Sequence, residues 1–366
     1  MKLKISVFFI LLSFNLIAQN SVLSDKETLQ EVEYGLDSIY NFQFDHVDEA
    51  YRDLKRKYPD HPLPPLFNAL SIYWQHFPVT PNGPYNDLYV NNITDAINKS
   101  EALLEKDKNN VEAIFLNLMS RLLIMQYYAD NDQSSKVIPH VRKAYKMVKK
   151  GFDLSDQLQD FLFSTGLYNY YREAYPEKHP VYKPIAYFFP DGNRKLGIKQ
   201  LEDNWHNGIF LDAESLSFLV YISLNFESNY KKSDKYTKEL NSSYPNNPLY
   251  LSYRIRTLLL LKKYNKALPL IQELNTNYSS NDFFQIMVYL YQGIYEEKKN
   301  QDFGKAEKLY WKAIKSLEKY QPFADSRVSY AYFGLSRIWE KKDHDKAVTY
   351  RNKALDLSSY SHINFD

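Results

Sequence analysis

Apolar residues recur along this chain at a helical spacing. Leu309, Ala313 and Ile314 fall on one face of a helix, while Lys308 and Lys312 fall on the other. Because side chains three or four residues apart share a face of an α-helix, this pattern predicts amphipathic, half-buried helices. Only 10 glycines occur in 366 residues, which is few for a chain with many tight turns. We therefore predict an all-α chain with almost no strand.

A second regularity marks every other predicted helix. A small or branched residue is followed seven places later by another, and often by a proline or a chain break five places beyond that. Ser233, Leu240 and Pro245 form one such set. Small side chains at these anchor positions let a neighbouring helix approach closely. The anchors fall near Val47, Ala96, Val137, Gly197, Ser233, Ala267, Ala306 and Ala347.

The anchors are spaced as in a chain of helical repeats. Ser233 and Ala267 lie 34 residues apart, which is the period of a tetratricopeptide repeat. In that repeat, two antiparallel helices form a unit that buries its apolar side only against its neighbours. The other intervals are longer, and each has room for a helix pair. We therefore predict a right-handed, tetratricopeptide-like solenoid of about eight antiparallel helix pairs, a single domain over residues 19–366.

Two proline-rich stretches interrupt the predicted helices. Proline inside a helix removes a hydrogen bond and clashes with the preceding turn, so we predict loop insertions at about 77–92 and 175–193. Loops of this size are uncommon in a helical body unless they cover or bind something. At the other end, Asn364 to Asp366 is expected to fray because no repeat follows. The prolines are Pro78, Pro81 and Pro84 in the first stretch and Pro176, Pro180, Pro184 and Pro190 in the second.

The end of the second stretch resembles a known family. It reads Gly192-Asn193-Arg194-Lys195-Leu196-Gly197-Ile198-Lys199-Gln200-Leu201. This is similar to the G-D-R-x-x-G-L-x-x-L segment of the tetratricopeptide repeat protein 39 and Iml2 family, and the likeness covers Asp153 to Glu202. The resemblance implies a helical-repeat, non-catalytic protein. Asn193 replaces the family's usual acid, and an apparent signal sequence replaces an intracellular start, so the cellular role is not carried over.

Physical chemistry gives these residues mainly structural roles. Gly192 and Asn193 tolerate a left-handed turn that would end the loop, and Asn193 can then cap the next helix. Gly197 stands at an anchor position, where close helix contact needs a small residue, and Leu201 follows it on the same face. Arg194 has two open interpretations, a solvated side chain or a contact to the loop.

The first residues have the layout of a secretory signal. Lys2 and Lys4 precede an apolar run from Ile5 to Phe14, and Asn15 to Ala18 follow it, with cleavage expected after Ala18. The alternative is an uncleaved anchor, but the run is shorter than the roughly 20 residues needed to cross a bilayer. We expect residues 1–18 to be a signal peptide of a secreted or periplasmic protein without a later membrane span. The Lys, Asn, Tyr and Ile bias is typical of a low-GC bacterium of the Bacteroidetes kind.

Charge and cysteine content narrow the class of partner. Without Lys2 and Lys4, the 46 basic residues become 44 and equal the 44 acidic ones. No global field would then attract nucleic acid, and we expect no nucleic-acid partner. The chain has no cysteine, so it has neither a disulfide nor a thiolate nucleophile nor a lipid-accepting cysteine. A peripheral association with the cell envelope stays open.

The sequence lacks the familiar enzyme motifs. It contains no dinucleotide-binding or phosphate-binding glycine loop, no G-x-S-x-G and no H-E-x-x-H. The eight histidines are scattered, so we expect no metal and no cofactor. We predict a protein that is not an enzyme. A pair of catalytic carboxylates needs no local motif, which keeps carboxylate catalysis as an alternative.

Aromatic residues crowd the second insertion. These residues have two interpretations. They cover the interior of the solenoid, or some of them line a pocket or groove that binds a peptide, a sugar or a lipid tail. Repeat scaffolds offer concave faces that suit polypeptides, so our leading hypothesis is a scaffold that binds a protein or peptide partner there. The alternative is a nutrient (glycan) capture protein associated with an outer-membrane transporter. The candidate contact residues are Tyr171, Tyr182, Tyr187 and Phe188.

Overall fold

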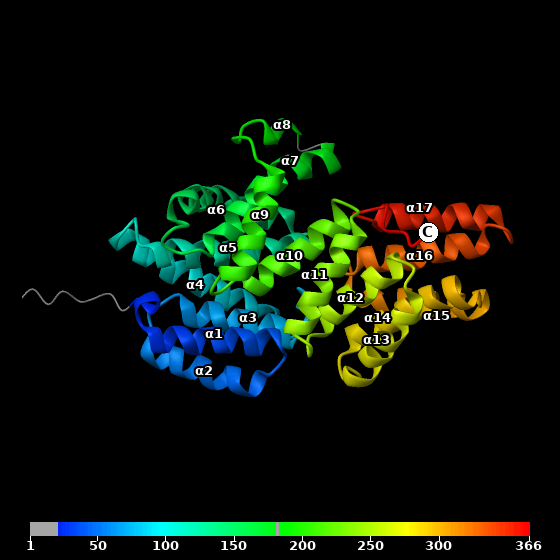
Figure 1. Cartoon of the computed structure of the whole chain (residues 1–366), viewed down its shortest axis with the longest axis horizontal. Helices are drawn as coiled ribbons and strands as arrows, with labels where there is room; N and C mark the ends of the chain where they lie inside the picture. The colour runs from blue at the N-terminus through cyan, green and yellow to red at the C-terminus, as the bar shows by residue number, and fades with distance from the viewer. Residues whose placement is uncertain (1–20, 181–182) are drawn as a thin grey trace, which may run out of the picture.

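The computed structural model describes residues 21–180 and 183–366. In this part of the chain, helix follows helix and no strand is present, so the all-α prediction is confirmed (Figure 1). None of these helices combines the length and the apolar character needed to span a membrane. The predicted signal peptide and Tyr182 lie outside the described residues.

Sixteen helices of 13 to 21 residues and one short helix, α8, make up the described chain. The first half contains α1 (Lys26–Tyr40), α2 (Phe44–Lys57), α3 (Leu63–Gln75), α4 (Asn86–Lys106), α5 (Val111–Asp130), α6 (Ser134–Leu154), α7 (Phe161–Lys178), α8 (Lys183–Ala186) and α9 (Arg194–Asn207). The second half contains α10 (Asp212–Asn225), α11 (Tyr230–Ser243), α12 (Pro248–Leu260), α13 (Tyr264–Asn277), α14 (Asp282–Tyr295), α15 (Phe303–Leu317), α16 (Asp325–Trp339) and α17 (His344–Leu357).

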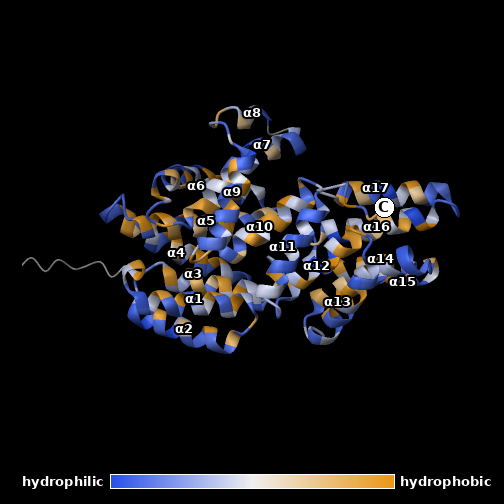
Figure 2. Cartoon of the chain, in the orientation of Figure 1, coloured by the Kyte–Doolittle hydropathy of each residue, from blue (hydrophilic) through white to orange (hydrophobic). Residues whose placement is uncertain are grey.

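Consecutive helices pack as neighbours from α1 to α17, as in helical-repeat solenoids. A second set of contacts links alternate helices, namely α1 with α3, α3 with α5, α10 with α12, α12 with α14, and α14 with α16. These helices form an inner layer, which is buried almost all round. Their partners form an outer layer with one buried stripe each, and Figure 2 shows hydrophilic residues along outer helices such as α2 and α11.

The predicted anchors all lie on outer-layer helices. Except for Ala96, each stands three residues after the first residue of its helix, and the anchors are buried apart from Val137. In α6 the buried stripe begins two turns after Val137, at Ala144, and continues through Val148 and Gly151. The stripe is narrow because an outer helix touches only its own partner and the next inner helix. The seven-residue spacing therefore predicted the packed faces correctly.

Polar caps set where many of these helices begin. A side-chain oxygen accepts a hydrogen bond from a backbone N–H in the first turn, which satisfies one of the donors that a helix start leaves free. Each such cap contributes about 1 kcal/mol. The capping residues are Asp25, Asn110, Asn193, Asn229, Asn247, Asn281, Asp302 and Asp343.

The first insertion is shorter than predicted, and it holds distant repeats together. Helix α4 begins at Asn86 because no proline follows Pro84, so the loop spans only 76–85. Phe77 in this loop is 4% exposed and packs against Phe283 and Phe284 of α14, with ring centroids 5.6 and 5.8 Å apart. The chain of helices thus curls until α3 meets α14.

Further contacts close the same curl between α1–α3 and the second half. The Trp74 ring lies 5.4 Å from the ring of Tyr250, centroid to centroid. Asn247 Nδ2 donates to the backbone oxygen of Tyr40 over 2.9 Å, and Asn281 Nδ2 donates to that of Phe77 over 3.2 Å. The inner layer is consequently apolar on most sides, because it is enclosed by its own chain.

The second insertion is also shorter than predicted. Helix α7 continues through Pro176 and ends at Lys178, since a proline two residues before the last helical residue disturbs only the final turn. The stretch from α7 to α9 projects from the body and carries α8 (Figure 1). The C-terminal expectation was wrong as well. Ile363 is fully buried, and the ring of Phe365 packs against Tyr330 at 5.3 Å.

Candidate functional site

The family-like segment joins α7 to α9, and its glycines serve close packing. A Cβ on Gly197 would lie 2.7 Å from the backbone oxygen of Gly166, so α7 and α9 touch main chain to main chain there. A Cβ on Gly192 would collide with the carbonyl oxygen of Asn169. No described glycine has a positive φ, and Asn193 has φ −148°, so the predicted left-handed turn was wrong. Glycine is required at these two positions because the backbone of α7 lies too close to leave room for a Cβ.

The polar residues of the segment fasten the same junction. The Asn193 side chain accepts a 2.9 Å hydrogen bond from the Leu196 N–H, which confirms the predicted cap. Arg194 forms ion pairs with Glu177, which lies in the predicted insertion, and with Glu173 of α7 at 3.6 Å, so of the two interpretations the contact to the loop is the nearer one. Leu201 is fully buried. The segment is therefore structural in this chain.

The candidate aromatic contact residues do not form one site. Tyr171 packs inward, with its ring centroid 5.1 Å from that of Phe226, the residue that follows α10. Tyr187 and Phe188, which follow α8, are 87% and 84% exposed. Tyr182 lies outside the described residues. A single aromatic platform made of these residues is therefore not what the described structure contains.

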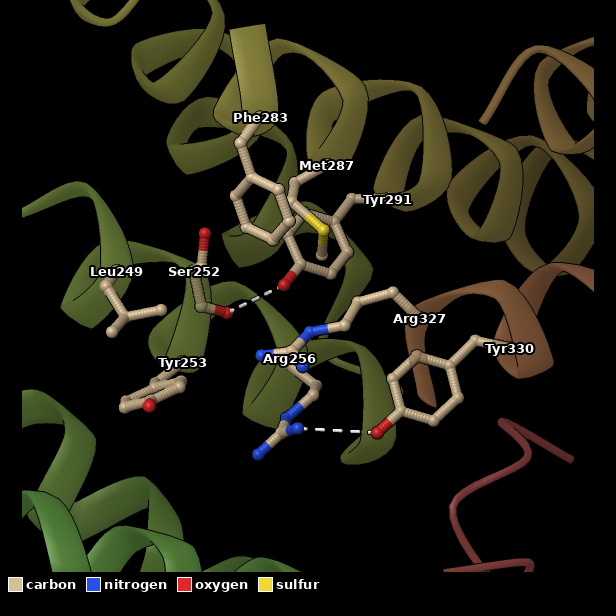
Figure 3. Close-up of a pocket in the computed structure, with 9 residues that line it drawn as sticks. All are labelled: Leu249, Ser252, Tyr253, Arg256, Phe283, Met287, Tyr291, Arg327 and Tyr330. Atoms are coloured by element: carbon tan, nitrogen blue, oxygen red, sulfur yellow. Dashed lines mark hydrogen bonds between the residues drawn. The ribbon is translucent and has the colours of Figure 1, made fainter. Parts of the chain in front are cut away.

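A pocket on the inner layer brings together residues that the sequence analysis did not select. It lies between α12, α14 and α16 and is small, with a cavity volume of about 20 Å³. We call it the Arg–Tyr pocket (Figure 3). Its lining consists of Leu249, Ser252, Tyr253 and Arg256 of α12, Phe283, Met287 and Tyr291 of α14, and Arg327 and Tyr330 of α16.

Arg256 enters the pocket without a carboxylate partner. Its Nη1 donates a long, 3.4 Å hydrogen bond to the Tyr330 hydroxyl, and its guanidinium lies 5.7 Å from the centroid of the Tyr253 ring. Its Nε is buried and has no hydrogen-bond partner among the described residues. A guanidinium stays charged at any physiological pH, so this half-buried side chain holds a cation with an unused, buried Nε donor.

Arg327 supplies a second cation from α16. Its Nη1 donates to the backbone oxygen of Phe323 over 3.2 Å, and its guanidinium stacks 5.1 Å from that ring's centroid. Among the described residues it forms no ion pair with a carboxylate within 4 Å. The nearest charge influence runs to Asp130, at the end of α5: burial raises the pKa of this carboxyl group, and the Arg327 cation acts in the opposite direction.

Neutral hydroxyls and apolar groups complete the pocket. Burial raises the pKa of Tyr253, and it raises the pKa of Tyr291 to about 12, so both phenols stay protonated at neutral pH. The buried Ser252 hydroxyl has no hydrogen-bond partner among the described residues. Met287 and Phe283 line the apolar side. Two cations, a free serine hydroxyl and an apolar wall suit an anionic group attached to an apolar one.

One sequence signal could have revealed this pocket. Arg256 stands in the run Leu249–Leu261, where most positions are apolar, and a charged residue in such a run usually has a partner. Its neighbour Arg254 resembles it in sequence but is paired with Asp234 of the preceding helix, α11. Only the structure separates the two arginines, because their side chains leave α12 in different directions.

From the sequence, one kind of enzyme stayed an alternative, namely one that uses a pair of catalytic carboxylates. Burial raises the pKa of Glu214 to about 7, and the Tyr40 hydroxyl donates to its Oε1 over 3.0 Å. Two residues earlier in α10, Asp212 accepts a 3.1 Å hydrogen bond from the Tyr244 hydroxyl. Both carboxyl groups lie where the end of α1 meets α10, and a tyrosine hydroxyl donates a hydrogen bond to one oxygen of each. They join distant repeats rather than face each other across the Arg–Tyr pocket.

Comparison with known proteins identifies no relative: no family model matches the chain, and no curated protein is significantly similar to it.

Proposed function

We propose that this chain is a right-handed, tetratricopeptide-like solenoid of about eight helix pairs, secreted or periplasmic, that binds a protein or peptide partner on its concave face. It acts as a non-catalytic scaffold related in architecture to the tetratricopeptide repeat protein 39 and Iml2 family. The buried anchors on alternating helices support the repeat type. The observation that carries the binding function is the unpaired Arg256 in the Arg–Tyr pocket.

The pocket defines the chemistry of the partner. A half-buried cation without a carboxylate partner is costly, and an incoming anion would supply a counter-charge to Arg256. Guanidinium groups pair with carboxylates through two parallel hydrogen bonds, which gives direction as well as strength. The volume of about 20 Å³ holds roughly one water-sized group, so only the tip of the acidic group would enter and its apolar neighbour would lie at the rim. We therefore propose that the partner presents an acidic group next to an apolar residue.

A peptide selection tests this function. A displayed random peptide library is selected on the full chain and on the double variant Arg256→Gln/Arg327→Gln. We expect the wild-type chain to enrich peptides with an acidic residue beside an apolar one, and the double variant to lose them. A synthetic peptide should bind at least tenfold more weakly to the variant, since a desolvated charge pair contributes about 2 kcal/mol or more.

Two controls make the result interpretable. Arg351→Gln removes an exposed arginine of α17 and should leave peptide binding unchanged. Arg256→Lys keeps the charge but not the planar fork, so binding should fall partway. Circular dichroism establishes that each variant is folded. Selection of no peptide at all, or equal binding by the wild type and the double variant, would refute the proposed function.

A further inference from the structure

Helix α6 concentrates positive charge on the outside of a chain that is otherwise balanced. Its 21 residues contain a single acid, Asp153. Lys143 is engaged with Glu101 at 2.6 Å, and Lys150 is engaged with the backbone oxygen of Lys108. The other exposed cations form no ion pair among the described residues. They are Lys136, Arg142, Lys146 and Lys149.

The same helix exposes apolar side chains. Ile138 is 71% exposed, and Val141 and Phe152 are also exposed. Together with Tyr145 they are spaced by three, four and seven residues, so they form one stripe along α6. Arg142 is adjacent to this stripe on the helix surface. The buried face of α6 is occupied by Ala144 and its turn neighbours, and at the edge of the stripe Tyr145 and Phe152 contact the ring of Tyr168 on α7, at 5.9 and 6.0 Å. Ile138 and Val141 make no ring contact of this kind with the described residues and stay exposed.

The segment after α8 adds two more exposed apolar groups beside α6. Tyr187 and Phe188 are the most exposed large hydrophobic residues of the described chain. The next residue, Phe189, packs edge-on against Tyr145 of α6 at 4.8 Å, and Arg172 donates two hydrogen bonds to its backbone oxygen, at 2.8 and 3.1 Å. These contacts fix the tips next to the stripe.

These features make one surface, the α6–α8 surface, which lies on one side of the array where α6, α7 and α8 gather (Figure 1). Its cations are Arg142, Lys146 and Lys149, and its apolar tips are Ile138, Val141, Tyr187 and Phe188. Single exposed hydrophobic residues are ordinary in proteins. Here they are grouped, they project from the body, and unpaired cations flank them.

We propose that the α6–α8 surface binds an anionic lipid bilayer. The apolar tips enter the headgroup region, and the cations contact lipid phosphates. A bilayer fits because projecting side chains insert readily into a soft interface, whereas a protein partner would require a complementary groove. Exposed aromatic tips beside lysines are the composition that binds at a membrane surface, and each nearby cation strengthens the attraction to acidic lipids. This would hold the scaffold at the envelope without a membrane span.

Vesicle sedimentation tests the proposal with the full chain. Vesicles of phosphatidylcholine alone are compared with vesicles containing about one third phosphatidylglycerol. We expect binding only to the anionic vesicles and loss of binding as salt rises. The triple variant Arg142→Gln/Lys146→Gln/Lys149→Gln should bind about fivefold more weakly per charge, roughly a hundredfold in all. The double variant Tyr187→Ser/Phe188→Ser should bind at least tenfold more weakly.

Matched controls lie on α15, far along the chain. Lys308→Gln/Lys315→Gln removes two exposed lysines, and Phe303→Ser removes an exposed aromatic ring, so both should bind vesicles like the wild type. Sedimentation with anionic vesicles that is equal for wild type and both surface variants would overturn the proposal. If the charge variant lost vesicle binding and Tyr187→Ser/Phe188→Ser kept it, insertion of the apolar tips would be refuted. Binding of poly-L-glutamate without binding of vesicles would assign the surface to an acidic protein instead.

Discussion

The ring of Phe77 is the part of the first insertion whose loss should matter most. It is 4% exposed and lies within 6 Å, centroid to centroid, of Tyr73, Phe283, Phe284 and Phe323. Truncation to alanine removes these contacts and leaves a cavity that the surrounding helix ends cannot fill. Buried phenylalanine-to-alanine changes cost about 3–5 kcal/mol, and we expect Phe77→Ala to reduce the free energy of unfolding by about 4 kcal/mol.

Urea unfolding followed by circular dichroism measures this change. The expected result is a lower midpoint with an unchanged slope, because the same surface is exposed on unfolding. Tyr187→Ala provides the control, since this residue is 87% exposed and its loss should change stability by no more than about 0.5 kcal/mol. A reduction for Phe77→Ala below about 1 kcal/mol would show that the loop is a passive linker.

A double-mutant cycle separates the contact across the curl from local effects. Phe77→Ala, Phe284→Ala and the double variant are compared by the same unfolding measurement. Residues in contact give coupling energies of about 0.5–3 kcal/mol, whereas distant ones add. Additive effects would refute the conclusion that the first insertion joins α3 to α14.

Three further predictions concern buried groups. Gly334→Ala should destabilise the chain by about 1–3 kcal/mol in thermal unfolding, because the new Cβ would collide with the buried ring of Tyr310. Glu297→Gln should cost about 3 kcal/mol, because it breaks a buried bidentate pair, with atoms 2.6 and 2.9 Å apart, and leaves Arg337 only its longer, 3.3 Å pair with the exposed Asp366; retained stability would show that the pair is dispensable. Burial raises the pKa of Glu214 from 4.5 to about 7, so the folded wild type holds this proton more tightly than the unfolded chain and loses up to about 3 kcal/mol between pH 4.5 and 7. Glu214→Gln should therefore be the more stable variant at pH 8 and equal to wild type near pH 4, and a pH-independent difference in urea midpoint would contradict that titration.

Local patterns in the sequence account for the helices and their packed faces. The positions of Ala306 and Ala347 could be predicted because a small residue and its partner seven places on report one face of one helix. The Asn193 cap could be predicted because a cap and its N–H are three residues apart. The insertions were predicted from their prolines, but their lengths were overestimated, since a proline limits a helix only at its own turn.

What the tertiary structure alone decided depends on residues far apart in the chain. Phe77 meets Phe284, and Arg256 meets Tyr330, only because the stacked helices curl back on themselves. The angle between successive helix pairs sets that curl, and it results from many small packing differences rather than from any motif. The sequence by itself thus determined an array of helices with small residues at their seams. The curl decided which cations would be left without a partner, because an ion pair depends on the distance between the two groups in space and not on their separation along the chain.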